Sequence, residues 1–246
     1  MDLGNGIRRR LRKFLGIDTF GHLDRSVIEL NDIRELKKAM GWTKNPVIDD
    51  PEIEVFDSIV DVNERRIRDA ECIGTVLCNT DPSVVLEIGT AEGRTTALMA
   101  INAPEAQVYT MNIPPEELFA GKGGELTTIA LEREKIGSYY RELRLKNITQ
   151  LLVNSAEWEP CIGPIDVALV DGCHDTEFVY NDTRKILKVV KAGSFVLWHD
   201  FEPGLINKFQ WIRSVCLGVE KLFEVGLLNG NIFHVKDSWL GIYKVP

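Results

Sequence analysis

Residues 84–96, Val-Val-Leu-Glu-Ile-Gly-Thr-Ala-Glu-Gly-Arg-Thr-Thr, constrain the fold more than any other stretch of the chain. A continuous apolar run leads into a glycine-bearing turn, and a helical pattern follows, which predicts a buried strand, a tight turn and a helix. In an open α/β sheet, ligands bind at such turns because helix N–H groups point into the crevice and glycine leaves room for the ligand. We therefore expect a nucleotide-like ligand here.

The spacing of the glycines narrows the class of ligand. A pyrophosphate-binding turn needs small residues at three places in G-x-G-x-x-G, and these places hold Gly89, Ala91 and Arg94. The arginine disfavours a NAD-dependent oxidoreductase. The spacing E-x-G-x-x-x-G, formed by Glu87, Gly89 and Gly93, instead resembles the first motif of class I S-adenosylmethionine (SAM)-dependent methyltransferases. The alternative is a glycine-containing turn that binds no ligand.

This resemblance implies which residues contact SAM. The SAM carboxylate faces the turn and the helix N-terminus, and Glu87 lies on the ammonium side. Asn112 stands where a carboxylate usually binds the ribose hydroxyls, and Asn154 also replaces an acid beside the adenine. An amide lacks the charge-assisted strength of a carboxylate. The implied cofactor-binding residues are Glu87, Gly89, Thr90, Gly93, Thr95, Asn112, Ser155, Ala156 and Asp171.

From residue 83 onward, strand and helix patterns alternate. Apolar, β-rich runs predict strands at 84–89, 107–111, 148–153, 165–170 and 194–198, and a closing hairpin at 231–235 and 239–244. Spaced apolar positions predict helices at 94–102, 125–145, 176–190 and 205–224. We expect an α/β protein with a Rossmann-like class I methyltransferase sheet, mostly parallel with a C-terminal antiparallel hairpin, plus N-terminal helices.

The first 80 residues precede this alternation. We expect a helical N-terminal extension over residues 1–80, with helices at 23–40 and 54–78, and a methyltransferase domain over residues 81–246. Residues 1–17 have the pattern of a short basic amphipathic helix. Such a helix lies on an anionic membrane surface, docks on its own domain, or mediates self-association into a homo-oligomer.

Charge and cysteine content exclude some classes of function. A net charge of −8 and a pI near 5.2 disfavour nucleic acid as a partner, because binding phosphates needs a basic surface. The five cysteines show neither paired spacing nor a ligand cluster with histidine, so they indicate neither disulfides nor zinc. We expect a cytoplasmic protein that acts on a small molecule.

The fourth and fifth predicted strands end in the segments Val-Asp-Gly-Cys-His-Asp, residues 170–175, and Trp-His-Asp-Phe, residues 198–201. Together with Gly-Ser-Tyr-Tyr-Arg at 137–141, they resemble a bacterial SAM-dependent methyltransferase family that includes macrolide-sugar O-methyltransferases and cephalosporin hydroxylase-like proteins. The resemblance covers residues 83–244. It implies methyl transfer to a hydroxyl oxygen of a sugar or another small polar metabolite.

Acidic and histidine side chains at these strand ends suit that chemistry. The resemblance implies His174 as the general base, with Asp171 as the second catalytic residue. Asp171, His199 and Asp200 are the predicted ligands of Mg²⁺ or another divalent cation, and the histidine favours a softer ion than magnesium. Alternatively, the aspartates only cap the following segments. Because acids are replaced at Asn112, Asn154 and His199, a non-catalytic ligand-binding or scaffold protein is the alternative function.

Two further features have open interpretations. The segment 114–124 is rich in proline and glycine, which predicts either a lid over the cofactor or a plain crossover. The tryptophans are expected in the core or in a pocket wall, with Trp198 at the border of the substrate.

Overall fold

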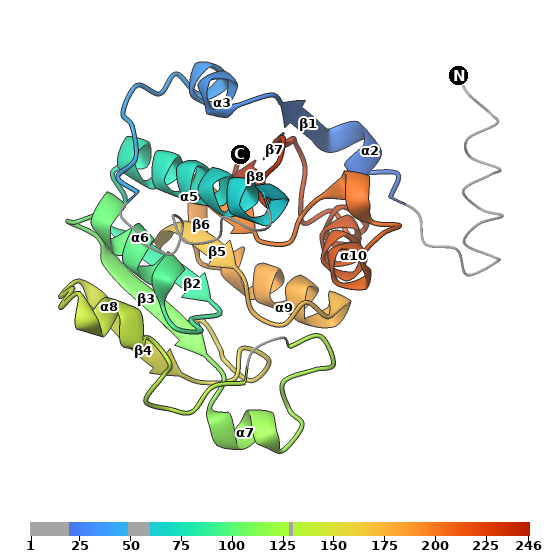
Figure 1. Cartoon of the computed structure of the whole chain (residues 1–246). Helices are drawn as coiled ribbons and strands as arrows, with labels where there is room; N and C mark the ends of the chain where they lie inside the picture. Colours follow the sequence, from blue (N-terminus) through green and yellow to red (C-terminus); the bar gives the residue numbers. More distant parts are fainter. Residues whose placement is uncertain (1–19, 49–59, 128–129) are drawn as a thin grey trace, which may run out of the picture.

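An eight-stranded sheet forms the centre of the computed structural model (Figure 1). The structure describes residues 20–48, 60–127 and 130–246. In the helix that begins at residue 60, it describes side chains only from residue 65 onward. The strand order is β1-β7-β8-β6-β5-β2-β3-β4. The strands are β1 (Val27–Leu30), β2 (Val84–Ile88), β3 (Gln107–Asn112), β4 (Ile148–Leu152), β5 (Ile165–Val170), β6 (Val190–Trp198), β7 (Ile232–Val235) and β8 (Gly241–Lys244).

The pairing of the strands confirms the predicted fold class. All neighbouring strands are parallel except β8, which runs antiparallel to both β6 and β7. From β2 the chain moves outward through β3 to β4, then returns to β5 on the other side of β2 and continues to β6. The strand order therefore reverses between β2 and β5, and open α/β sheets bind ligands at such a switch point.

Helices cover both faces of the sheet (Figure 1). They are α2 (Leu23–Ser26), α3 (Ile33–Met40), α5 (Val60–Thr80), α6 (Arg94–Asn102), α7 (Pro115–Phe119), α8 (Ser138–Glu142), α9 (Thr176–Ile186) and α10 (Gln210–Glu224). Side chains of α3, α5 and α6 form one buried apolar cluster with the sheet, and those of α9 and α10 form the other. This arrangement explains why β2 and β5, covered on both sides, are nearly continuous apolar runs.

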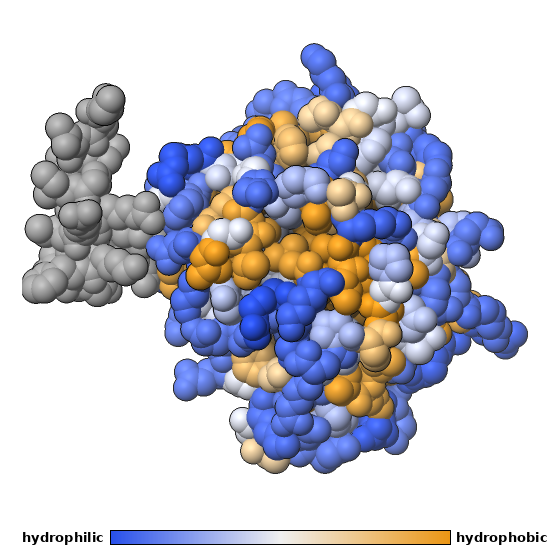
Figure 2. Space-filling model, turned by 180° about the vertical axis from the view of Figure 1, so that it is seen from behind, coloured by the Kyte–Doolittle hydropathy of each residue, from blue (hydrophilic) through white to orange (hydrophobic). Residues whose placement is uncertain are grey.

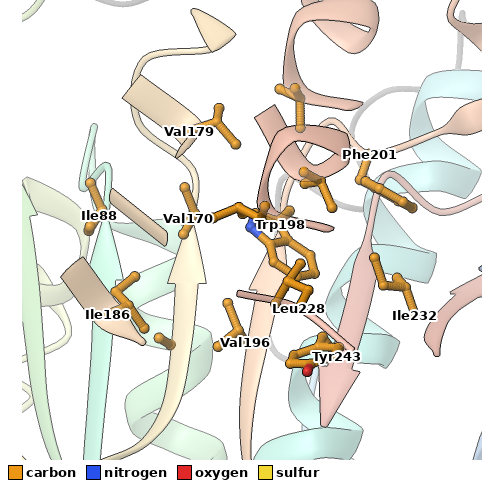
Figure 3. Packing of buried hydrophobic residues seen from close by; sticks show 14 of the residues in the cluster. Ile88, Val170, Val179, Ile186, Val196, Trp198, Phe201, Leu228, Ile232 and Tyr243 are labelled. Atoms are coloured by element: carbon orange, nitrogen blue, oxygen red, sulfur yellow. The ribbon is translucent and has the colours of Figure 1, made fainter. Parts of the chain in front are cut away.

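Trp198 belongs to the core, which is one of the two places predicted for the tryptophans, and it does not lie at the predicted border of a substrate site. Its side chain is fully buried, and its indole Nε1–H donates a hydrogen bond to Thr183 Oγ1 at 2.8 Å. The ring packs near Phe201 and Tyr243 (Figure 3). The side chain of this last residue of β6 therefore points into the α9 and α10 layer, away from the carboxyl edge of the sheet.

The helix predicted over residues 23–40 is wrong in its middle. Residues 27–30 form strand β1, which pairs in parallel with β7 at the edge of the sheet. Asp32 then caps α3, because its carboxylate accepts hydrogen bonds from the N–H groups of Arg34 and Glu35. The apolar spacing alone did not distinguish one helix from a short helix, a strand and a capped helix.

The helix predicted over residues 125–145 is also wrong, because among the described residues of this range only those of α8 are helical. The backbone N–H of Gly137 donates to Ala91 O at 2.9 Å, and that of Tyr139 donates to Glu92 O at 3.0 Å. These bonds tie the segment before and within α8 to the turn after β2. The predicted helix over 205–224 is likewise shorter, because a 3-10 turn (Pro203–Leu205) precedes α10.

The surface of the described part is largely hydrophilic. From behind, hydrophobic residues gather in a central band surrounded by hydrophilic ones (Figure 2). Among the described helices, none is long and apolar enough to cross a membrane. The basic segment predicted to contact a membrane or a second subunit, residues 1–17, lies outside the described residues.

Candidate active site

A cleft of about 780 Å³ opens at the carboxyl ends of β2, β3, β5 and β6, at the switch point of the sheet. Ten of the residues predicted for the site line it: Gly89, Thr90, Gly93, Thr95, Asn112, Ser155, Asp171, His174, His199 and Asp200. The two others, Glu87 and Ala156, are not among its lining residues. Its volume lies in the range of pockets that enclose small molecules.

Gly89 is required by the protein itself, which corrects the expectation that it leaves room for a ligand. Its φ angle is +109°, and a Cβ atom there would lie 1.9 Å from the carbonyl oxygen of Asp171. The end of β2 therefore packs backbone against backbone on the end of β5. Gly93, the residue before α6, has a φ of +87°, and a Cβ there would collide with Tyr140.

The turn between Gly89 and Gly93 is held by hydrogen bonds from outside it. Ala91 has a left-handed φ of +46°, and its N–H donates to Asn112 Oδ1 at 3.2 Å. The Nδ2 group of Asn112 donates to Ile113 O at 3.0 Å. Asn112, which was predicted to bind the ribose, thus also stabilises the turn. Its Nδ2 retains one N–H, and its Oδ1 can accept one more hydrogen bond from a group in the cleft.

Glu87 lies directly below the turn and is fully buried. Its Oε2 accepts hydrogen bonds from the hydroxyls of Thr110, at 2.6 Å, and Thr96, whereas its Oε1 is buried without a hydrogen-bond partner among the described residues. Burial raises the pKa of Glu87 to about 8. An unpartnered carboxylate oxygen at this position is costly and suits a bound cationic group or water.

The loop after β4 is fixed from α9. Ser155 Oγ donates to Asp182 Oδ2 at 3.1 Å, and Lys185 Nζ donates to the carbonyl oxygens of Ser155 and Ala156 at 2.7 and 2.8 Å. Burial raises the pKa of Asp182 to about 7. Asn154 Oδ1 in turn accepts the N–H of Ala156 at 3.0 Å. This network places the segment beside the cleft opposite the turn after β2.

A cluster of carboxylates and imidazoles forms the other half of the cleft. His174 Nε2 lies 2.7 Å from Asp200 Oδ2, and His199 Nδ1 lies 3.1 Å from Asp171 Oδ1 and 3.6 Å from Asp200 Oδ2. Asp171, His174 and His199 each offer one ligand atom, and these atoms all lie within 4.8 Å of one another. The structure therefore brings together all four residues predicted from the two strand ends.

The charges within the cluster balance one another. Burial disfavours the charged form of each imidazole, but the carboxylates outweigh it, so the pKa of His174 is raised and that of His199 is well above its usual value. Burial alone would raise the pKa of Asp200, yet His199 and His174 hold it far below its usual range. The carboxylates therefore favour the protonated form of both imidazoles, and the imidazoles favour the ionised form of Asp200.

The segment after α7 positions His174. Both its backbone N–H, at 3.3 Å, and its Nδ1–H, at 2.9 Å, donate to Leu126 O. The proton on Nδ1 leaves Nε2 as the nitrogen that faces the cluster. Gly123 and Thr127 also line the cleft, so this segment closes one side of it. Whether residues 114–124 act as a lid stays a prediction.

Sequence reasoning missed Arg66 and Asp69, which line the cleft from α5. Both lie in the segment that was assigned to an extension outside the methyltransferase domain. The charged residues around them look like an ordinary solvated helix face, so no pattern in the sequence distinguishes them. Trp211 and Trp239, expected in the core or a pocket wall, do line the cleft. The division at residue 80 itself stays a prediction.

Comparisons with known proteins agree with this fold. Residues 86–201 match a family model described as a methyltransferase domain. A putative O-methyltransferase from Klebsiella pneumoniae is similar in structure, with a TM-score of 0.52, 14% identity and coverage of 86% of this chain and 94% of that chain. No curated protein matches the sequence.

Two further solved structures are similar. TomG, an O-methyltransferase from Streptomyces achromogenes involved in tomaymycin synthesis and solved with SAM, has a TM-score of 0.52, 14% identity and coverage of 81% and 92% of the two chains. A methyltransferase from Podospora anserina, PaMTH1, solved with SAH bound, has a TM-score of 0.54, 14% identity and coverage of 87% and 94%. Residues 86–201 thus match a methyltransferase domain, and the fold is that of class I, SAM-dependent methyltransferases.

Proposed function

We propose that the protein transfers the methyl group of SAM to a hydroxyl oxygen of a sugar or another small polar metabolite. The observation that supports this most is the single cleft in which the turn of residues 89–93 faces the cluster of Asp171, His174, His199 and Asp200. A cofactor site and a proton-accepting group in one enclosure are what an in-line methyl transfer needs.

The residues present fit SAM. The unpartnered Oε1 of Glu87 suits the ammonium end, directly or through water, and the N-terminus of α6 suits the carboxylate. Asn112 faces the cleft at the end of β3, where we place the ribose. The loop at Ser155 and Ala156 would border the adenine. SAM supplies the electrophilic methyl group, and the protein orients it against the acceptor.

His174 is the proposed general base. Its Nδ1 is committed to Leu126 O, so Nε2 is the nitrogen that would receive the acceptor proton. Asp200, 2.7 Å from Nε2, stabilises the imidazolium that forms. Turnover therefore requires His174 to begin in its neutral form, which acceptor binding and the loss of a proton to solvent would provide.

The donor set also fits a divalent cation, which would lower the pKa of the acceptor hydroxyl when bound. We propose Asp171, His199 and Asp200 as its ligands, with His174 left free as the base. The imidazole among the ligands favours Mn²⁺ or another softer ion over Mg²⁺. His174 lies close enough to serve as a ligand instead, and that role would exclude its role as base.

Equilibrium titration tests the cofactor assignment directly. Calorimetry with SAM, its demethylated product SAH and NAD should give binding of the first two only. Glu87→Gln, which keeps the volume but cannot form a carboxylate beside the ammonium group, should weaken SAM binding. A folded protein that binds neither SAM nor SAH would contradict the proposed function and favour a scaffold role. With binding established, a screen of hydroxylated acceptors with radiolabelled SAM identifies the substrate.

A further inference from the structure

Asp69 of α5 faces the imidazole of His199 from the side opposite to Asp171. Its Oδ2 lies 3.5 Å from His199 Nε2, while Nδ1 of the same ring faces Asp171 at 3.1 Å. The separation of 3.5 Å is an ion-pair contact and not a hydrogen bond. The ring is thus held between carboxylates on both of its nitrogen atoms.

The second oxygen of Asp69 is fixed by the C-terminal hairpin. Asp69 Oδ1 accepts the backbone N–H of Trp239 at 2.6 Å, and Trp239 O accepts the N–H of Phe201 at 2.9 Å. This chain of bonds runs from α5 through the hairpin to the residue two positions after His199. The side chain of Asp69 is only 9% exposed, so it has little freedom to turn elsewhere.

Neighbouring contacts fix α5 on the hairpin in the same way. Arg65 Nη1 lies 3.2 Å from both Glu202 Oε2 and the carbonyl oxygen of Ser238. Its guanidinium also lies over the ring of Trp239, 4.0 Å from the centroid. These contacts would therefore keep α5 docked on the hairpin even without the carboxylate of Asp69. The docking of α5 thus does not explain why Oδ2 of Asp69 faces His199.

We propose that Asp69 is a positioning residue: it holds His199 with Nε2 toward α5, so that Nδ1 is presented to Asp171 and Asp200 in the cleft. A carboxylate on the far nitrogen of an imidazole ligand fixes the orientation of the ring and strengthens its basicity. The inference rests on the proposed function only where it concerns a cation at Asp171, His199 and Asp200. It makes the segment before the matched domain part of the active site.

Two substitutions at Asp69 separate positioning from docking. Asp69→Asn keeps an oxygen for the N–H of Trp239 and loses the charge toward His199, whereas Asp69→Ala loses both. The matched control is Glu220→Gln, because Glu220 is a buried carboxylate paired with a histidine outside the cleft, 2.8 Å from His22 Nδ1. The chain has four histidines, so nitrogen–proton spectra of all the rings can be assigned by single substitutions.

We expect the His199 ring signals to move in Asp69→Asn as far as in Asp69→Ala, with the His22 signals unchanged. Glu220→Gln should give the reverse pattern. If His199 keeps its wild-type signals in Asp69→Asn and loses them only in Asp69→Ala, Asp69 merely anchors the hairpin and the proposal is wrong. Neither SAM nor an acceptor is needed for this comparison.

Titration with Mn²⁺ alone gives a second readout. The dissociation constant for Mn²⁺ should rise about 10–100-fold in Asp69→Asn, while the affinity for SAH stays within about twofold of the wild type. Equal Mn²⁺ affinity in the two proteins contradicts the positioning of a cation ligand. A wild-type protein that binds no Mn²⁺ instead contradicts the cation in the proposed function, and the ring spectra still decide the role of Asp69.

Discussion

Gly89 and Asp171 touch through their backbones, and a Cβ atom on Gly89 would lie 1.9 Å from Asp171 O. The N–H of Asp171 also donates to Ile88 O at 2.8 Å, beside the same contact. The turn that we propose to bind the cofactor and Asp171 of the proposed catalytic cluster therefore share one close backbone approach. A change at either one displaces the other.

Gly89→Ala should destabilise the fold and abolish SAH binding together, because relieving the collision requires the ends of β2 and β5 to separate. We expect a loss of about 3 kcal/mol or more in the free energy of unfolding. Chemical denaturation and calorimetry measure the two effects. Gly121→Ala is the control, since Gly121 has a φ of +79° with open space around its Cβ position and should cost only about 1 kcal/mol. Equal losses in the two variants would argue against the packing constraint.

Asn112→Asp should tighten SAM binding by about 1 kcal/mol, or roughly fivefold, since a carboxylate forms charge-assisted bonds to ribose hydroxyls. The new side chain keeps an acceptor for the N–H of Ala91 but loses the donor to Ile113 O. Asn112→Ala, which removes both, should weaken binding. Weaker binding in Asn112→Asp as well would show that bracing the turn, rather than binding the ribose, is the main role of Asn112.

His174→Ala should lower kcat by about 10²–10⁴-fold and leave the dissociation constant for SAM nearly unchanged, because a general base acts in the transition state. Rapid-quench or steady-state kinetics with an identified acceptor measure this. Calorimetry with Mn²⁺ on the same variant separates the two proposed roles. Retained Mn²⁺ affinity supports the base, and lost affinity would mean that His174 is a cation ligand.

Removal of divalent cations should lower activity, and added Mn²⁺ or Mg²⁺ should restore it. Asp200→Ala should lose both its activity and its response to cations, because Asp200 is a proposed ligand and also pairs with His174. Chelator titration with back-addition of each ion is the measurement. Full activity in chelator would leave a methyltransferase that acts through positioning and His174 alone.

Asp182 should make the protein less stable as the pH rises. Its folded-state pKa of about 7 lies above the ordinary 3.8, so between these values the folded state binds a proton that the unfolded state has lost. The stabilisation is complete below pH 3.8 and disappears as the pH rises through 7. Asp182→Asn cannot titrate, so its stability relative to the wild type should improve from pH 5 to pH 8. Thermal melts measure this, with Asp237→Asn, the same substitution at an exposed position, as the control.

The strands of the central sheet could be predicted closely because burial on both faces requires a continuous run of apolar residues, which is visible in the local sequence. The apolar run at 165–170 has the bounds of β5, and the predicted strand at 84–89 exceeds β2 by one residue. The residues that follow these strands were found for the same reason, since parallel strands place their carboxyl ends at one edge. The helices predicted at 23–40 and 125–145 are wrong because contacts with distant parts of the chain outweigh the helical spacing of the apolar residues. Residues 27–30 pair with strand β7, and the backbone before and within α8 forms hydrogen bonds with the turn after β2.

The sequence by itself determined the α/β fold class, the turn with Glu87, Gly89 and Gly93, and the gathering of Asp171, His174, His199 and Asp200. Each of these follows from residue types at fixed distances along the chain. Only the tertiary structure decided that Gly89 makes room for Asp171, that Trp198 lies in the core rather than in a pocket wall, and that Asp69 faces His199. The last contact joins residues 130 positions apart in the sequence through α5 and a hairpin. No local periodicity encodes such a contact, because it depends on how whole elements pack.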